Sequence, residues 1–529
     1  MRKLGKFLLA AVIALGFAAC NNKEDVPNTG GGTTEGTTYM SVSFRIDDGV
    51  MTRAEDGKHN TQGNWEGRDK FNNVSIYLVE DNKVSLKEMS MSELTRPSSA
   101  QDGVYATQPW KTTAGEKTVY VVLNNNGAIK VALDGAMTSG KTAFDAAYKN
   151  AYEMLSLGKV NTAYAKVDND KKDVILMTGY PTTQIITDGV KAIETATKNR
   201  VKVSLRRVVS RVAVSMNKTL DYSENSPLEV KTKEDVVIGH LKNLAWTPMQ
   251  YEVKSNLLWQ ATDGSDSYTA DLVKSWPDAF AYVPNNNFKT EASKYYDYTR
   301  KTEALPIRTD FERTTQEATI AYITDAEKNN MEFITETTHT YGVKLDDGSS
   351  ATKTGYRRGN STYVMVTGTF APAEAAWAND TEKDEYASRV GADPNATIDL
   401  YWGVVKGKFY VDEARAKADN PIMNPEPGQD GIIKYTAGKM YYFAWVNPNT
   451  NQVTTWVNSP VVRNNIYHVN IAGFENIGLY HNPYDPNDPG DDDDPDPKDP
   501  DDPLYDTETF MITEITVINW GMHSYDITF

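Results

Sequence analysis

Short runs rich in β-branched and aromatic residues recur along the chain, and they constrain its fold more than any other feature. Most are bounded by Asn, Asp, Gly or Pro, which is typical of strands that end in turns. The runs cover residues 74–79, 118–123, 174–177, 201–214, 362–370, 400–405, 439–446 and 466–471. Segments 141–157 and 371–377 are expected to be helical. Because helices do not alternate regularly with these strands, the pattern predicts antiparallel β-sandwiches rather than a doubly wound sheet.

The length of 529 residues, with 40% hydrophobic residues, is enough for two or three domains with cores of their own. We expect a domain boundary between about residues 205 and 225, which divides the body into 54–215 and 216–481. The formal net charge of −17 argues against nucleic acid as a partner, because phosphates require clustered Lys and Arg.

The N-terminus has the order of a bacterial lipoprotein signal, predicted to be residues 1–20. Arg2, Lys3 and Lys6 supply the basic start, and the apolar run 7–17 is too short to span a membrane comfortably. Two alanines then precede Cys20, the single cysteine of the chain. We expect Cys20 to be diacylated and to anchor the precursor by lipid. The alternative is a plain secretory signal in which Cys20 is incidental. With one cysteine, an intrachain disulfide and a CxxC site are both excluded.

Residues 21–53 are predicted to be a propeptide that consists of a polar tether and a removable first strand. Met40, Val42, Phe44 and Ile46 alternate with polar residues, which is the period of a half-buried strand. A polar stretch follows, and Arg53-Ala54 within it is the natural site for a protease cut. Arg45, the other arginine of the propeptide, lies inside the predicted strand. The alternative is that Arg53 is an ordinary surface residue.

The C-terminal end combines an unusual linker with two strand-like segments. Residues 482–503 contain seven prolines and ten aspartates, so the linker assigned to 482–505 cannot bury a core. At roughly 3.1 Å per residue it could extend about 70 Å. Segment 506–529 follows, and its alternating positions on one face are Met511, Thr513, Ile515, Val517, Tyr525, Ile527 and Phe529.

A strand of this kind is an aggregation hazard unless it finds a partner, and the long spacer before it indicates a distant one. A cut after Arg53 would release the first strand and leave a groove with apolar walls and unpaired backbone groups. The C-terminal strand of a neighbouring copy could fill that groove by β-augmentation. This hypothesis makes the chain a subunit that polymerises without disulfides.

Several segments resemble the type V pilins of Bacteroidales bacteria, the fimbrillin family, and are similar to the shaft subunits of short, Mfa-type fimbriae. The resemblance covers nearly the whole mature chain and is carried by residues 52–54, 74–78, 119–124, 357–364, 440–445, 458–468 and 509–526. It implies two transthyretin-like antiparallel β-sandwich domains and a C-terminal donor strand. Thr513 and Asn519 depart from the expected apolar valine and turn-forming proline.

The resemblance also implies a route of export, proteolytic maturation and assembly. The precursor would reach the outer membrane as a lipoprotein, an Arg-specific protease would remove the first strand, and donor-strand exchange would join identical subunits head to tail into a cell-surface fimbria. Accessory anchor and tip subunits, and host or bacterial surface ligands, would be further partners. The implied role is adhesion and biofilm formation.

The sequence gives little support for an enzymatic function. Residues 135–142 fit the P-loop formula, but only a short apolar stretch precedes them, and a loop that caps a helix is the better account. The six histidines are far apart, and the aspartates 491–494 lack EF-hand spacing and suit a solvated tether. No catalytic residue, cofactor or metal is therefore assigned. The alternative function is a monomeric surface lipoprotein that binds glycans.

Overall fold

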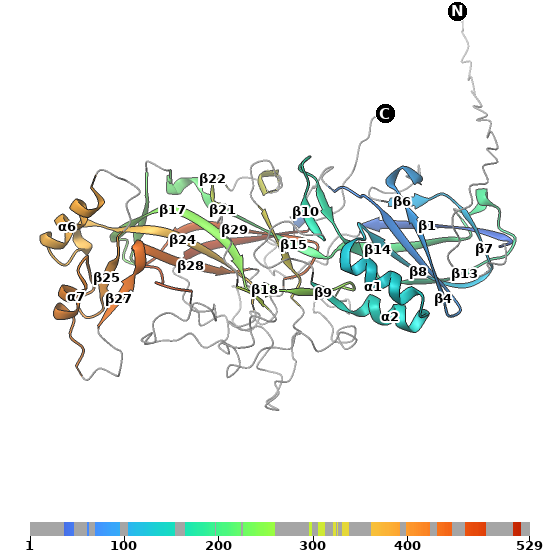
Figure 1. The fold of residues 1–529 in the computed structure, drawn as a ribbon. Helices are drawn as coiled ribbons and strands as arrows, with labels where there is room; N and C mark the ends of the chain where they lie inside the picture. Colours follow the sequence, from blue (N-terminus) through green and yellow to red (C-terminus); the bar gives the residue numbers. More distant parts are fainter. Residues whose placement is uncertain are drawn as a thin grey trace, which may run out of the picture.

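The computed structural model describes residues 36–46, 61–62, 69–95, 104–153, 164–195, 197–223, 226–259, 296–298, 305–312, 321–323, 325, 331–337, 361–391, 398–423, 431–446, 461–482 and 511–519. These residues form an elongated body in which the N-terminal strands occupy one end and the helices α6 and α7 the other (Figure 1). Most elements are strands, and the expected all-β class is confirmed.

The first domain is one curved sheet that closes around its own apolar core. Its strands, in the order β4-β3-β8-β12-β14-β1-β6-β5 with β13 on β8 and β7 on β1, are β1 (Thr38–Ile46), β3 (Val74–Glu80), β4 (Lys83–Met89), β5 (Leu94–Thr95), β6 (Val104–Thr107), β7 (Trp110–Thr112), β8 (Gly115–Leu123), β12 (Met177–Thr178), β13 (Thr182–Ile186) and β14 (Arg200–Arg207). Alternate residues of β1, β3, β8 and β14 point inward, as the period of two requires, and form the core.

Two helices cover the outer face of β3 and β8. They are α1 (Gly127–Met137) and α2 (Lys141–Lys149), and they lie beside these strands in Figure 1. Phe144 of α2 packs on Tyr77 and Tyr120, with ring centroids 4.8 and 5.1 Å apart. Both faces of β3 and β8 are therefore buried, which explains their continuous apolar runs.

The second domain is a sandwich of two sheets. One sheet has the order β2-β30-β29-β15-β22 with β23 on β15; its strands are β2 (Thr61–Gln62), β15 (Val209–Asn217), β22 (Arg308–Phe311), β23 (Met331–Thr335), β29 (Asn465–Phe474) and β30 (Met511–Asn519). The facing sheet has the order β16-β17-β24-β28 with β21 on β17; its strands are β16 (Leu228–Lys231), β17 (Val237–Met249), β21 (Leu305–Pro306), β24 (Tyr363–Pro372) and β28 (Lys439–Trp445). The apolar faces of the two sheets share one core.

A small module extends the far end of the second domain. It contains the sheet β26-β25-β27, formed by β25 (Leu400–Gly403), β26 (Lys408–Tyr410) and β27 (Ile432–Tyr435), together with η8 (Glu374–Ala376), α6 (Asp380–Val390), α7 (Glu413–Asp419) and η9 (Thr436–Gly438). Figure 1 shows α6, α7, β25 and β27 at the end opposite β7 and β13.

Short elements complete the described structure. They are η1 (Met91–Glu93), β9 (Ala151–Glu153), β10 (Ala165–Val167), β11 (Asp173–Ile175), η2 (Ala192–Glu194), η3 (Lys218–Leu220), β18 (Tyr251–Glu252), β19 (Lys254–Asn256) and β20 (Tyr296–Asp297). Among them, β9 pairs with β19, so a hydrogen-bonded ribbon also joins the two domains.

The chain passes from one domain to the other at Val208, between β14 and β15. The expected strand 201–214 is therefore two strands in different sheets, and the crossing lies within the region 205–225 in which a domain boundary is expected. Arg207 and Arg211, one on each side of this crossing, are buried and pair with Asp69 and Asp173. A single strand of 14 residues would carry half of its side chains away from the core of the domain in which they are buried.

Three further expectations differ from the structure. The expected helix 141–157 ends at Lys149, because the chain turns at Asn150 into β9 and pairs with β19. Segment 371–377 holds the end of β24 and one 3-10 turn, while the helix α6 begins only at Asp380, where Asn379 caps it. Strand 400–405 ends at Gly403, before an exposed turn.

Candidate functional site

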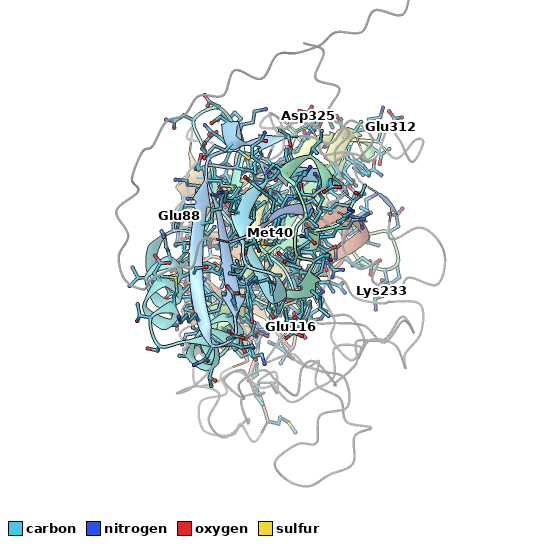
Figure 2. All side chains as sticks on the ribbon, turned by 90° about the vertical axis from the view of Figure 1, so that its right-hand side faces the viewer. Met40, Glu88, Glu116, Lys233, Glu312 and Asp325 are labelled. Atoms are coloured by element: carbon cyan, nitrogen blue, oxygen red, sulfur yellow. The ribbon has the colours of Figure 1, made fainter. Side chains whose placement is uncertain are left out.

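The first strand, β1, lies inside its sheet rather than at an edge. It pairs in parallel with β14 on one side and antiparallel with β6 and β7 on the other. The four side chains expected to face inward are buried, with exposed fractions from 0% to 5%: Met40, Val42, Phe44 and Ile46. Figure 2 looks along the body from this end and shows Met40 at the centre of the view. The apolar face is thus buried as expected, but the strand is not half-buried, because Ser41 and Ser43 on its other face are also buried, with exposed fractions of 0% and 5%.

Phe44 packs against the aromatic wall beside β1. Its ring stacks on Tyr105 of β6, with centroids 5.7 Å apart, and Tyr105 contacts Phe71 edge to face. Val201, Val203 and other side chains of β14 continue the wall on the opposite side. Without β1, this wall and two rows of backbone groups would face solvent.

Polar contacts hold the beginning of β1. Thr38 Oγ1 donates to Thr187 O at 2.8 Å and accepts from Val190 N at 3.0 Å. The buried side chain of Asn199 donates to Tyr39 O and to Thr187 O, each at 2.9 Å. Further along, Val42 N donates to Thr107 Oγ1 at 3.0 Å. These groups fix the register of β1, because a shift of one residue would leave them unpaired.

The polar contacts around Thr38 form a clamp on the beginning of β1, and Asp188 adds two hydrogen bonds to it on the solvent side. Its carboxylate accepts from Thr37 Oγ1 at 2.6 Å and from Gly189 N at 2.8 Å, and these bonds hold the pKa of Asp188 below its usual value. A lowered folded-state pKa means that the bond contributes stability above the unfolded pKa of about 3.9. The contribution is lost as the pH falls through the folded pKa, so the clamp is complete at neutral pH.

The C-terminal strand, β30, lies in the second domain of its own chain. It pairs antiparallel with β29 along its length, with Thr513 opposite Ile471, Ile515 opposite Val469 and Val517 opposite Tyr467. A bulge at Ala472 and Gly473 interrupts the register, and Met511 is buried in the domain core. The expected strand is therefore present, but its partner in this chain is β29 rather than the distant partner that the spacer suggested.

The outer edge of β30 is covered near its end. Thr61 and Gln62 of β2 pair in parallel with Ile518 and Asn519. A segment that follows the predicted cut site thus contacts the predicted donor strand.

Six predicted site residues lie outside the described residues: Cys20, Arg53, Ala54, Tyr525, Ile527 and Phe529. The acidic linker 483–510 also lies outside them. In the part of the chain that is described, no helix is long and apolar enough to cross a membrane. Within the same ranges, no group of three His, Cys, Asp or Glu side chains could hold a metal ion.

The P-loop-like segment has the wrong structural context for phosphate binding. The helix α1 precedes it instead of a buried strand, and Gly140, with φ of +91°, is the N-cap of α2. A Cβ at Gly140 would come within 2.9 Å of Asn82 O, so glycine allows this tight approach. The interpretation as a helix-capping loop agrees with this geometry.

Sequence reasoning missed the residues that hold β1 and join the domains. Asn199 and Thr107 carry no local pattern. Arg206, Arg207 and Arg211 inside an apolar run were a usable signal, because a charge in a buried strand requires a partner. Arg463, in the turn before β29, is fully buried as well, and its Nε donates to Glu336 Oε2 at 2.7 Å.

Comparisons with known proteins place this architecture in a family. Residues 433–526 match the family model "Major fimbrial subunit protein type IV, Fimbrillin, C-terminal". The chain is 33% identical over 548 aligned residues to "Minor fimbrium subunit Mfa1" of Porphyromonas gingivalis, and the alignment covers all of both chains. A second Mfa1 sequence from this organism matches over the same lengths, also at 33% identity.

Solved structures are more distant. A fimbrilin of Porphyromonas gingivalis W83 has 13% identity and a TM-score of 0.41, with 93% of this chain and 99% of that chain covered. The tip fimbrial protein Mfa3 has 10% identity and a TM-score of 0.30, with 83% and 96% covered. The full-length identity to the Mfa1 sequences decides the assignment: the chain belongs to the Mfa1 family and is a fimbrial subunit, a structural protein of cell-surface fimbriae.

Proposed function

We propose that this protein forms the shaft of its fimbria by strand exchange between identical copies. In this proposal the precursor is exported as a lipoprotein anchored at Cys20, and an Arg-specific protease cuts between Arg53 and Ala54. The cut removes β1, and the C-terminal tail of a neighbour, residues 506–529, then fills the groove.

The observation that carries the proposal is the internal position of β1. A strand paired on both sides, with four buried apolar side chains, cannot leave without opening a groove of its own shape. At roughly 1.5–3 kcal/mol for each side chain, its removal forfeits about 6–12 kcal/mol of burial before hydrogen bonds are counted. Because the open groove has lost this free energy of apolar burial, binding of a replacement strand is strongly favourable.

The position of β30 supplies the second support. Each copy stores this strand on its own β29, and a transfer to a neighbour would exchange one ladder for another. The net gain would therefore come from filling the open groove rather than from the tail itself. Anchor and tip subunits, and surface ligands, would be the further partners of such a shaft.

Deletion of residues 510–529 tests the donor role. We expect a folded protein, because β29 keeps β15 as its partner on the other side, but no fibres after the cut. Circular dichroism reports the fold, and electron microscopy with heat-sensitive ladders on gels reports assembly. As a control, serine at positions 491–494 removes acidic residues of the linker but keeps the tail, and should still assemble. Fibres of normal length from the deletion variant would refute the donor role.

Phe44→Ala tests whether β1 is absent from the fibre. Loss of this buried ring should destabilise the uncut precursor by about 3–5 kcal/mol. Fibres should have unchanged stability, because they would no longer contain residue 44. Phe370→Ala, in the core of the second domain, is the control that should weaken both forms. Denaturant unfolding measures each; weaker fibres from Phe44→Ala would mean that β1 is retained.

A further inference from the structure

The exposed large apolar side chains of the described residues gather at the two ends of the body. They are Val131, Ile185, Ile193, Val236, Val404, Val405 and Met423. Val131 is on α1, on the flank. The other six belong to the outer end of the first domain or to the outer end of the second. Scattered exposed apolar residues need no explanation, but this distribution does.

The far surface, defined as Val404, Val405 and Met423, belongs to the small module. Val404 and Val405 form the turn between β25 and β26. β27 continues through η9 into β28 of the sandwich, so Tyr435 is its inner end and Ile432 its outer end. Gly403 lies opposite Ile432, and the turn therefore projects away from the body.

Two polar contacts fix this turn on the module. Lys406 N donates to Asn420 Oδ1 at 2.7 Å, and Val404 N donates to Gly431 O at 2.9 Å. Met423, which is 90% exposed, follows three residues after Asn420. The apolar turn is therefore held in one conformation even though solvent surrounds it.

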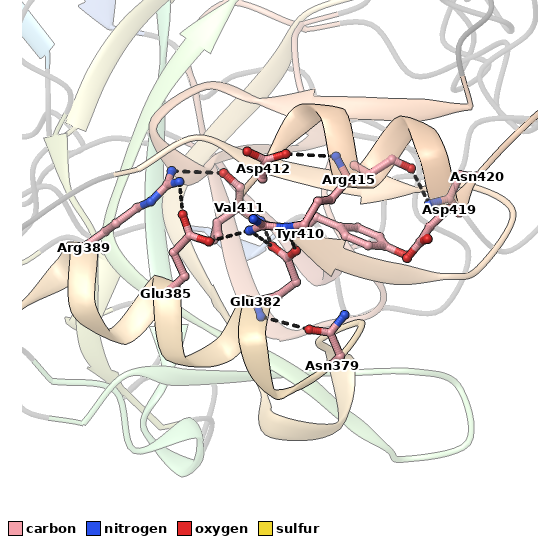
Figure 3. A network of polar contacts seen from close by, with 11 residues as sticks. Asn379, Glu382, Glu385, Arg389, Tyr410, Val411, Asp412, Arg415, Asp419 and Asn420 are labelled. Atoms are coloured by element: carbon pink, nitrogen blue, oxygen red, sulfur yellow. Dashed lines mark hydrogen bonds and ion pairs between the residues drawn. The ribbon is translucent and has the colours of Figure 1, made fainter.

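An ion-pair network between α6 and α7 stabilises the small module that carries the turn. Figure 3 shows the fully buried Glu382 of α6 accepting from Val411 N, at 2.8 Å, and from the guanidinium of Arg415 on α7. Arg415 also pairs with Glu385, and these carboxylates raise the pKa of Arg415 above its usual value. Charged groups with several partners of this kind order the elements that carry them.

The near surface, defined as Ile185 and Ile193, lies at the opposite end. Ile193 is 89% exposed on η2, and Val190, three residues before it, bonds the beginning of β1. Ile185 of β13 lies opposite Glu116 of β8, which Figure 2 labels in the view of this end. The near surface therefore borders the groove that β1 fills.

We infer that the far surface of one copy docks on the near surface of the next, beside the groove that receives the donor strand. This inference rests on the proposed function and adds the contact that orients the two copies. Two different patches at opposite ends make a head-to-tail contact, and such contacts generate open filaments rather than closed dimers. The contact would hold a neighbour in place while its tail enters the groove.

The charges at the two surfaces support a second copy of this chain as the partner that docks there. The chain as a whole is acidic, with a formal net charge of −17, yet Lys406 and Lys408 flank the far surface. Two exposed carboxylates, Glu116 and Asp188, lie at the near surface, together with the exposed Lys191 and the ion pair between Lys198 and Glu194. A basic turn that meets these two carboxylates would offset part of the repulsion between copies and favour the head-to-tail orientation.

A crosslinking experiment tests the contact directly. The cut protein lacks Cys20, so it contains no cysteine. Val405→Cys and Ile193→Cys in one chain should give disulfide-linked ladders in assembled fibres under mild oxidation. Val405→Cys with Val131→Cys is the matched control, because Val131 is 73% exposed on the flank. Equal crosslinking in both variants, or none with Ile193→Cys, would overturn the inference.

Charge substitution measures the effect of the contact on assembly. Val404→Glu with Val405→Glu should slow fibre growth at least tenfold, whereas Val131→Glu should leave the rate unchanged. A synthetic peptide of residues 506–529 should still bind the groove of every cut variant, which separates this contact from strand exchange. Growth of the double variant at the Val131→Glu rate would overturn the inference. Failure of the peptide to bind unsubstituted cut protein would instead refute strand exchange itself.

Discussion

Arg53→Ala should leave the protein folded on the cell surface with β1 in place, and no fibres should form. The reason is that β1 is held by two ladders, four buried side chains and the clamp around Thr38, so it does not leave while its covalent connection to the body is intact. N-terminal sequencing and electron microscopy of surface material measure the outcome. Unsubstituted fibres should begin at Ala54.

Arg45→Ala is the control for this experiment. Arg45 lies within β1, opposite Ser204 of β14, where a protease cannot fit the extended strand into its active site. We expect normal cutting and normal fibres, because residue 45 is removed with the propeptide. Fibres of Arg53→Ala that still contain residues 40–46 would contradict the proposed maturation.

Arg463→Ala should cost about 3–5 kcal/mol of the free energy of unfolding, because it leaves the buried carboxylate of Glu336 without its partner. The guanidinium also donates to Leu257 O at 3.1 Å, Asn256 O at 2.7 Å and Ser255 Oγ at 3.1 Å. Ser255 and Asn256 belong to β19, which pairs with β9 of the first domain. The loss should therefore loosen the connection between the domains as well as the core.

Denaturant unfolding with probes in each domain measures this effect. Arg463→Lys should recover little, because a single ammonium cannot reach the acceptors that the planar guanidinium contacts together. Arg389→Ala is the control: it removes a half-exposed ion pair with Glu385 and should cost within about 1 kcal/mol. A cost below about 1 kcal/mol for Arg463→Ala would show that the buried network does not stabilise the joint.

Burial explains why this arginine matters so much. It raises the pKa of Glu336, since a carboxylate removed from water is costly, and Arg463 opposes that rise. The two residues are 127 positions apart, so no local pattern connects them. The sequence shows that each charged residue stands near apolar ones, but not which opposite charge it meets in the fold.

Much of the fold could be predicted from local patterns. The alternation of Met40, Val42, Phe44 and Ile46 predicted a strand and its buried face, and both are present. The C-terminal alternation from Met511 likewise predicted β30. Side chains in a strand alternate between faces, so burial on one face leaves a direct trace in the sequence.

Helices α1, α6 and α7 are harder to predict from the sequence than the strands. They are short, and α6 and α7 have mostly polar sequences with few buried residues. Their positions depend on caps, such as Asn379, and on ion pairs between elements, such as Arg415 with Glu382. Neither feature repeats with a fixed period.

The sequence by itself therefore determined several of the strands, β1, β3, β8 and β30 among them, and that the last strand follows an acidic spacer, whereas it did not reveal others such as β17 and β23. The tertiary structure decided which strands are neighbours: that β14 and β15 separate at Val208, that β1 lies between β14 and β6, and that β30 rests on β29. The physical reason is that periodicity reflects whether a face is buried, whereas pairing depends on shape and on charges far apart in the chain.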